Sequence, residues 1–289
     1  MATSPPAPLM QAFKPTPALA DCVTDLWIWE IPLGARAPDA SALTLLPDGH
    51  PTLCFVYGAP LTASDGVARF TTRSAVCGFQ FRPVQLSCAG HAAGITVRFK
   101  PWALSRFVPA SLEAFAGRRV EIRDLCSPAQ VEALESELFD LPTPVARVRR
   151  VERFLLHLMQ ARGQSRLVEA AVGRLTQGGA DTRMGQLARE LGATERTLER
   201  HFRRAVGVAP KTFSRVMRLQ AALTPVAGPA RWSEVALDAG YCDQAHLIRD
   251  SRALFGTPPA RFVSPLDNPI AQGFQNLAQQ TALATTIFR

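Results

Sequence analysis

A pattern of small, apolar and turn-forming residues occurs twice in the C-terminal third of the chain, with the two copies 48 residues apart up to the turn glycine and 49 apart after it. In each copy an alanine is followed four positions later by a glycine, and a Gly-x-x-Pro-x-x-Phe run closes the copy. These residues are Ala188, Gly192 and Gly207–Phe213 in the first copy, and Ala236, Gly240 and Gly256–Phe262 in the second. A repeat at a fixed period indicates two copies of one structural unit.

Each copy meets the physical demands of a helix-turn-helix. Two helices that meet at a sharp angle need a short turn, commonly containing glycine, and a small residue where they touch. The second helix needs an N-cap, which Thr194 and Asp243 provide. Its buried face must recur at i and i+4, as Leu198 and Phe202 do. Two such units in tandem predict a protein that reads DNA in two adjacent grooves; the alternative is two helical hairpins without a DNA role.

The outer face of each second helix carries groups that reach base edges. Arg196 and Arg200 suit bidentate donation to guanine, and Gln244 suits adenine. Glu199 has two interpretations: it accepts a hydrogen bond from cytosine N4, or it pairs with Arg203 at i+4 on the solvated face.

The C-terminal region resembles the DNA-binding domain of a known protein family. Residues 165–264 are similar to the tandem helix-turn-helix domain of AraC/XylS-type transcriptional regulators. The resemblance rests on Arg218–Leu223, which is similar to the Arg-Leu-x-x-Ala of that family's linker helix, and on Gly240–Arg249, which is similar to its second-copy motif. It implies that each recognition helix lies in its own major groove, about 10 bp from the other.

The resemblance also assigns the residues that touch DNA. The implied base-contacting set is Arg196, Glu199, Arg200, Gln244, Ala245, His246 and Arg249. We expect phosphate contacts, which add affinity without sequence information, from the following residues: Thr194, Arg203, Arg204 and Lys211.

The chain departs from the family pattern at two positions. Ser251 stands where the second recognition helix usually has a large aromatic residue, with Leu254 and Phe255 nearby to compensate, and Pro225 shortens the linker helix. We therefore expect the first unit to supply most of the affinity and the second to adjust specificity.

The N-terminal region has a different pattern of apolar and turn-forming residues. Residues 1–18 are rich in proline and predict a flexible arm. Residues 19–126 alternate short apolar runs with turn signals, which predicts an antiparallel β-rich sensor or dimerisation domain. Residues 127–164 carry helical periodicity and predict connecting helices, and the tail 265–289 is not assigned. The expected fold is α+β with two domains: an N-terminal antiparallel β-barrel with linking helices, and a C-terminal all-α domain.

Residues 43–125 also resemble the cupin-like sensor of a subgroup of these regulators. The motifs are Leu46–Gly49 and Gly94–Pro101. The resemblance implies a β fold with an effector pocket but does not identify a ligand. The residues considered for a pocket have a second interpretation as core aromatics or a buried ion pair: Trp27, Trp29, Tyr57, Arg98 and Trp102.

Charge is placed unevenly along the chain. Residues 1–144 carry 11 basic and 13 acidic residues, whereas residues 145–263 carry 20 and 10. A basic region confined to one part of a chain is the footprint of nucleic-acid binding, although a solvated surface gives the same count. No export signal and no apolar stretch of about 20 residues is apparent, so we expect a cytoplasmic protein.

A rival hypothesis is a small-molecule-binding or metal-dependent cupin enzyme with a helical appendage. A metallo-cupin needs several converging histidines and a carboxylate, whereas only His50 and His91 lie in this region. We therefore predict no catalytic residues, no metal and no cofactor. Cys77 and Cys88 leave a redox sensor open beside the alternative of buried, inert thiols.

The expected partner is double-stranded DNA. A small-molecule effector, RNA polymerase and a second copy of the chain stay open as further partners, and no membrane association is expected. A spare apolar face on the connecting helices has two interpretations, a dimer surface or packing within its own domain.

Overall fold

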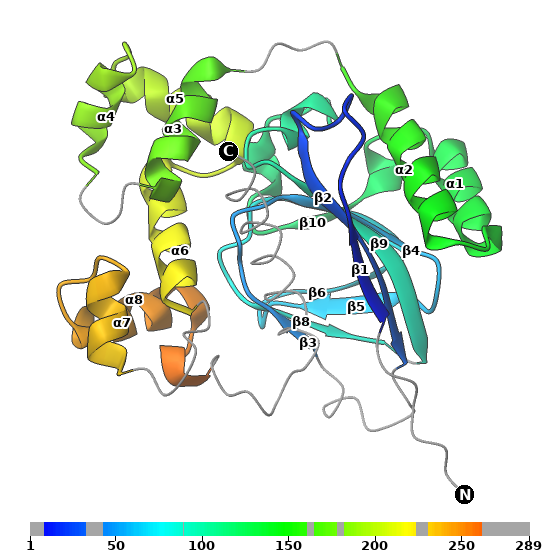
Figure 1. Ribbon diagram of the computed structural model, residues 1–289, viewed down its shortest axis with the longest axis horizontal. Coiled ribbons are helices and arrows are strands. Elements are labelled where there is room, and N and C mark those ends of the chain that lie inside the picture. The colour runs from blue at the N-terminus through cyan, green and yellow to red at the C-terminus, as the bar shows by residue number, and fades with distance from the viewer. Residues whose placement is uncertain are drawn as a thin grey trace, which may run out of the picture.

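The computed structural model describes residues 9–32, 43–88, 90–160, 165–177, 182–223 and 231–261. An N-terminal β domain is followed by two helices that pack against it and then by a helical domain (Figure 1). The predicted α+β architecture with two domains is confirmed. Pro225, Phe262 and the tail 265–289 lie outside the described residues.

The β domain contains two antiparallel sheets. One has six strands in the order β1-β2-β9-β4-β7-β10, and the other has four in the order β3-β8-β5-β6. The strands are β1 (Leu9–Phe13), β2 (Val23–Pro32), β3 (Leu43–Leu45), β4 (Thr52–Val56), β5 (Leu61–Ser64), β6 (Arg69–Thr72), β7 (Ser74–Cys77), β8 (Val84–Ser87), β9 (His91–Phe99) and β10 (Arg119–Glu121). Among the strands that the structure describes, no pairing joins the two sheets.

The core of the β domain lies between the six-stranded sheet and the two connecting helices. Ile28, Ile95 and Phe55 come from neighbouring strands and are fully buried. The ring of Phe55 meets that of Phe154 edge-on at 5.7 Å between centroids. Phe154 lies on α2 (Pro144–Leu158), which follows α1 (Pro128–Asp140). One apolar cluster thus holds sheet and helices together, so the connecting helices pack mainly within this part of the chain.

One expectation about the N-terminal arm is wrong. Part of residues 1–18 forms β1, which pairs antiparallel with β2, Leu9 opposite Glu30 and Phe13 opposite Leu26. The prolines of this region flank β1 and do not interrupt it, and an edge strand tolerates nearby proline because one of its sides makes no ladder hydrogen bonds. Beyond the strand, the backbone N–H of Thr16 donates to Glu152 Oε1 at 2.6 Å.

The helical domain is arranged around one helix, α6. Its helices are α3 (Arg166–Gln177), α4 (Met184–Glu190), α5 (Glu195–Val206), α6 (Pro210–Leu223), α7 (Trp232–Asp238) and α8 (Gln244–Phe255). Figure 1 shows α3, α4 and α5 around one end of α6, with α7 and α8 at the other. No helix in the described part of the chain has both the length and the apolar character needed to cross a membrane.

The β domain packs directly on the helical domain. The ring of Phe79, after β7, lies 5.6 Å from that of Phe213 on α6. The turn at Gly49 also faces α6: its φ of +78° is in the left-handed region, and a Cβ there would overlap the sulfur of Met217. This turn therefore has both a backbone and a packing reason to be glycine.

The contact at Gly49 predicts a stability difference between two glycine variants. Gly66 has φ +82° with nothing within 4 Å of an added Cβ, so Gly66→Ala is the matched control. Both variants should lose about 1–2 kcal/mol of unfolding free energy from left-handed strain. Gly49→Ala should lose about 1 kcal/mol more, because Met217 must move. Urea unfolding measures both; equal losses would show that Met217 yields freely.

Candidate nucleic-acid interface

The first repeat folds as a helix-turn-helix of α4, a turn and α5. Gly192 in the turn has φ +69°, a conformation that glycine adopts without strain. The side chain of Thr194 caps α5 by accepting a hydrogen bond from the backbone N–H of Thr197 at 3.2 Å. Leu198 and Phe202 are buried at i and i+4. The turn, the cap and the buried face predicted for this unit are all confirmed.

The second repeat has the same construction from α7, a turn and α8. Gly240 has φ +76°, and the carboxylate of Asp243 accepts from the backbone N–H of His246 at 2.6 Å. Ser251 is fully buried, and its hydroxyl donates to the carbonyl oxygen of Thr257 at 2.7 Å. Phe255 is buried in the same unit, with Leu254 packed partly buried against it. The small residue thus makes a satisfied hydrogen bond beside a compensating apolar contact.

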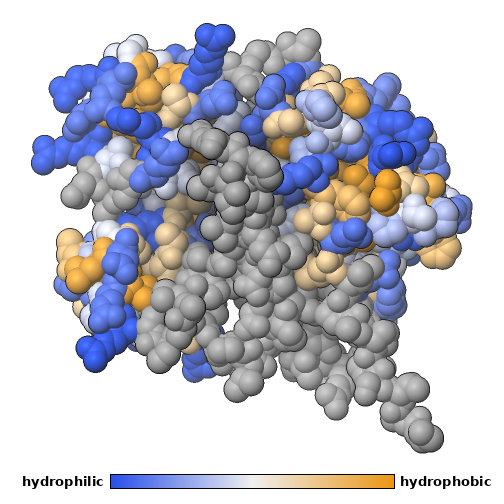
Figure 2. Space-filling model, viewed as in Figure 1, coloured by the Kyte–Doolittle hydropathy of each residue, from blue (hydrophilic) through white to orange (hydrophobic). Residues whose placement is uncertain are grey.

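The outer face of α5 presents a row of arginines. Arg196, Arg200 and Arg204 recur at four-residue intervals and are exposed. Lys211 is exposed at the start of α6, and Thr194 at the start of α5. Figure 2 shows strongly hydrophilic side chains over much of the region of α4 and α5. A recognition helix that carries cations on its solvent face can meet both phosphates and base edges.

Glu199 and Arg203 bind each other in this conformation. The guanidinium of Arg203 donates from Nε and Nη2 to Glu199 Oε1 at 3.0 and 2.9 Å, and this hydrogen bonding raises the pKa of Arg203. Arg203 also lies 3.5 Å from Glu113, on the 3₁₀ helix η2 (Leu112–Phe115) of the β domain. Of the two interpretations of Glu199, the intrahelical pair is the one present here.

The outer face of α8 is more mixed. Gln244, Ala245 and Arg249 are exposed. His246 is partly buried, with its ring edge-on to that of Tyr241 at 5.1 Å. Four of the residues predicted for base contact on this helix therefore lie within its first two turns, three of them freely accessible.

A charged network that sequence reasoning missed joins α8 to α6. Asp250 is 6% exposed and accepts hydrogen bonds from Arg215 at 2.5 and 3.1 Å. Its second oxygen accepts from the hydroxyl of Tyr241 at 3.1 Å and lies 3.6 Å from Arg218. The Arg218 guanidinium stacks over the Tyr241 ring at 4.4 Å. Burial, then the charge of Asp250, raises the pKa of Tyr241, which stays a neutral donor.

One sequence signal pointed to this network. Asp250 follows Leu247 by three positions and so falls on the buried face of α8. A carboxylate at a buried helical position needs a partner, but the sequence does not say which cation supplies it.

The residues considered for an effector pocket are largely part of the β-domain core. Arg98 donates to Asp25 at 3.1 Å, lies 3.0 Å from Asp48 and covers the Trp27 ring. Burial raises the pKa of Asp25, while Arg98 opposes that effect. Trp29 is also buried. The interpretation as core aromatics and a buried ion pair therefore holds for Trp27, Trp29 and Arg98.

The candidate redox and metal-ligating residues can be checked in the part of the chain that the structure describes. All six cysteines are free; Cys77 is buried, and burial raises the pKa of the Cys88 thiol. Among the residues that the structure describes, no group of three or more His, Cys, Asp or Glu is placed to hold a metal ion.

Comparison with protein families identifies the helical repeats. A family model for a helix-turn-helix domain matches residues 187–264, which run from within α4 of the first unit through α8 of the second. The C-terminal domain is an AraC-type helix-turn-helix domain. A second model, for a domain of unknown function (DUF6597), matches residues 11–121. The AraC-type match supports a DNA-binding transcriptional regulator.

Solved structures similar to the chain include several regulators. ToxT from Vibrio cholerae is 7% identical, with a TM-score of 0.47 over 82% of this chain and 97% of that one. A probable AraC family transcriptional regulator from Rhodopseudomonas palustris is 26% identical, with a TM-score of 0.31 over 34% of this chain and 95% of that one. The AraC-like transcriptional activator CuxR is 17% identical, with a TM-score of 0.26 over 68% and 73%. No curated protein matches the chain.

The Asp250 network predicts that loss of this carboxylate lowers the stability of the C-terminal domain. Asp250→Ala leaves Arg215, Arg218 and Tyr241 without their acceptor, and should lower the free energy of unfolding by about 2 kcal/mol. Asp250→Asn keeps an acceptor and should lose less. The control is Asp238→Ala, exposed on α7, which should stay within about 0.5 kcal/mol. Urea unfolding compares the three; equal effects of Asp250→Ala and Asp238→Ala would contradict the network.

Proposed function

We propose that this protein is a sequence-specific DNA-binding transcriptional regulator that reads one asymmetric site with two recognition helices. The observation that carries the proposal is the pair of capped helices, α5 and α8, held at opposite ends of one helix with their polar faces exposed. Each helix would enter a major groove, and α6 would set the distance between the two.

The roles of the side chains follow from their chemistry and exposure. Arg196 and Arg200 would donate to guanine, and Gln244 to adenine, with Ala245, His246 and Arg249 on the same face. Arg204 and Lys211 would contact phosphates, as would Thr194 at the start of α5. Arg203 and Glu199 would reach DNA only after their mutual hydrogen bonds are exchanged for contacts with the nucleic acid.

An effector response would pass through the contact between domains. The β domain touches the DNA-binding domain at α5, through Glu113 and Arg203, and at α6, through Phe79 and Phe213. A ligand that changes the β domain would alter these contacts and so the affinity for DNA, provided it binds the two states with different affinity.

The proposal predicts a steep salt dependence of binding. Each phosphate neutralised by a cation releases counterions, with a slope of about −0.9 per contact in log K against log salt. Contacts from Arg203, Arg204 and Lys211 alone predict about a 40-fold loss of affinity between 50 and 200 mM salt. Fluorescence anisotropy with DNA from upstream of the chain's own gene measures this, with a random duplex as control. Equal affinity for both duplexes would contradict sequence-specific recognition.

Substitutions on the two helices should separate base contacts from phosphate contacts. Arg196→Ala and Arg200→Ala should each reduce discrimination at one base pair by about 1–3 kcal/mol. Lys211→Ala should weaken preferred and random duplexes alike and lower the salt slope by about 1. Competition binding with single-base variants of the preferred site distinguishes the two patterns, and the reverse result would overturn these assignments.

A further inference from the structure

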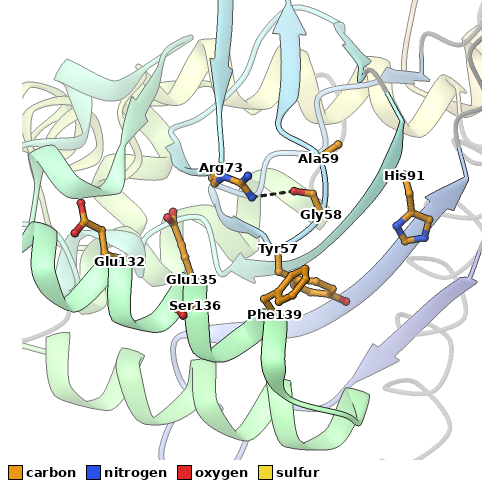
Figure 3. Close-up of a pocket in the computed structure, with 9 residues that line it drawn as sticks. All are labelled: Tyr57, Gly58, Ala59, Arg73, His91, Glu132, Glu135, Ser136 and Phe139. Atoms are coloured by element: carbon orange, nitrogen blue, oxygen red, sulfur yellow. Dashed lines mark hydrogen bonds between the residues drawn. The ribbon is translucent and has the colours of Figure 1, made fainter.

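An open cleft lies where α1 meets one end of the six-stranded sheet. Its volume is about 630 Å³, within the range of small-molecule sites. One wall is the face of α1 that carries Glu132, Glu135 and Phe139 (Figure 3). The other is the chain after β4, at Tyr57 and Gly58, together with Arg73, between β6 and β7, and His91 at the start of β9. The cleft is separate from the buried Arg98 cluster and from both recognition helices.

The α1 wall carries an excess of negative charge. Arg123 lies 3.8 Å from Glu132 and 3.5 Å from Glu135, and also pairs with Glu121 at 3.2 Å. The single positive charge of Arg123 is therefore shared among three carboxylates. Glu135 is mostly buried, with a side chain 12% exposed, and its Oε1 has no hydrogen-bond partner among the described residues. Because Arg123 is shared among three carboxylates, this wall keeps acceptor capacity and negative charge for a cationic group of a ligand.

The sheet wall carries the opposite charge. Arg73 is held in place through its backbone, since its carbonyl oxygen accepts from the N–H of Val56 at 2.6 Å. One guanidinium N–H donates to the carbonyl oxygen of Gly58 at 2.9 Å (Figure 3). An arginine has five N–H donors, so this bond fixes the group at the cleft and leaves others for an anion.

Two aromatic residues also line the cleft, Phe139 on α1 and Tyr57 after β4. Phe139 is 69% exposed, an unusual position for a large aromatic ring. Figure 3 draws both residues among those that line the cleft. The hydroxyl and ring of Tyr57 are already engaged by Arg147, at 3.5 and 4.4 Å, and burial raises its pKa to about 12. Tyr57 is therefore a neutral aromatic group at the cleft and not an ionised one.

We propose that this cleft binds a zwitterion of the amino-acid class with an apolar or aromatic side chain. Its ammonium group would meet Glu135 and Glu132, its carboxylate would meet Arg73, and its side chain would cover Phe139. A ligand with only one charge would satisfy one wall and leave the other unpaired. Binding of the zwitterion does not depend on the proposed function. Only the conclusion that this ligand regulates DNA binding rests on it.

Three ligands that differ by one group test the proposal on the unmodified full-length chain. L-phenylalanine has both charges, its amide lacks the carboxylate, and 3-phenyllactate lacks the ammonium group. Isothermal titration calorimetry should show L-phenylalanine binding at least about tenfold more tightly than either analogue, because each loses one charged hydrogen-bonding partner. Equal affinities for all three, or no binding of L-phenylalanine at millimolar concentration, would overturn the proposal.

Variants then assign each charge to its wall. Arg73→Gln should weaken L-phenylalanine about tenfold but leave the amide unchanged, since the amide has no carboxylate for Arg73 to bind. Glu135→Gln should weaken L-phenylalanine and leave 3-phenyllactate unchanged. The controls are Arg69→Gln on the adjacent strand and Glu137→Gln on α1, both outside the cleft lining. A uniform loss for all ligands would mean that a variant perturbs the cleft as a whole and would count against the assignment.

The outcome is distinguishable from a failure of the proposed function. Anisotropy with DNA is measured on the same preparation without amino acid. A chain that binds DNA specifically but no amino acid overturns the cleft assignment alone. A chain that binds L-phenylalanine through Arg73 and Glu135 but no DNA supports the cleft and overturns the proposed regulator.

Discussion

The apolar face of α6 is the constraint on which the rest of the DNA-binding domain depends. Phe213 and Val216, near its start, belong to the core of the first unit, whereas Leu219 and Leu223 belong to that of the second. Each buried side chain of this kind stabilises the fold by about 1.5–3 kcal/mol. Since one rigid helix enters both cores, neither unit can shift along it without losing burial. The Asp250 network adds a polar restraint, because it fixes α8 to the same helix.

The β domain is linked to this helix through a chain of direct contacts. Arg98, inside the β domain, holds Asp48 at 3.0 Å. The next residue, Gly49, has no room for a side chain against Met217 of α6. Leu46, before the same turn, packs against the core of the second unit. A contiguous set of packed groups therefore runs from the buried ion pair of the β domain to α6, which contacts both helix-turn-helix units. Packed networks of this kind can carry energetic coupling between domains.

Local chemistry explains which features could be predicted from the sequence. Caps and turn glycines act over a few residues, so Thr194, Asp243, Gly192 and Gly240 were recognisable from spacing alone. The Glu199–Arg203 pair was one of two local alternatives for the same reason. The contact between Asp250 and Arg215 and the contact between Glu113 and Arg203 could not be predicted, because they join residues 35 and 90 positions apart. Strand β1 was missed because the prolines that flank it indicated an arm, whereas its pairing with β2 cannot be read from local sequence.

The difference between the two units lies more in charge than in packing. Ser251 does not leave an unsatisfied core, because its hydroxyl bonds Thr257 and Phe255 is buried beside it. The exposed row on α5 consists of three arginines, whereas the residues of α8 predicted to contact bases include only one arginine, Arg249, beside Gln244 and Ala245. Contacts by cations weaken with salt through counterion release, whereas a neutral amide donating to a base does not. Raising the salt concentration should therefore weaken the contribution of the first unit more than that of the second, and specificity would then depend increasingly on α8.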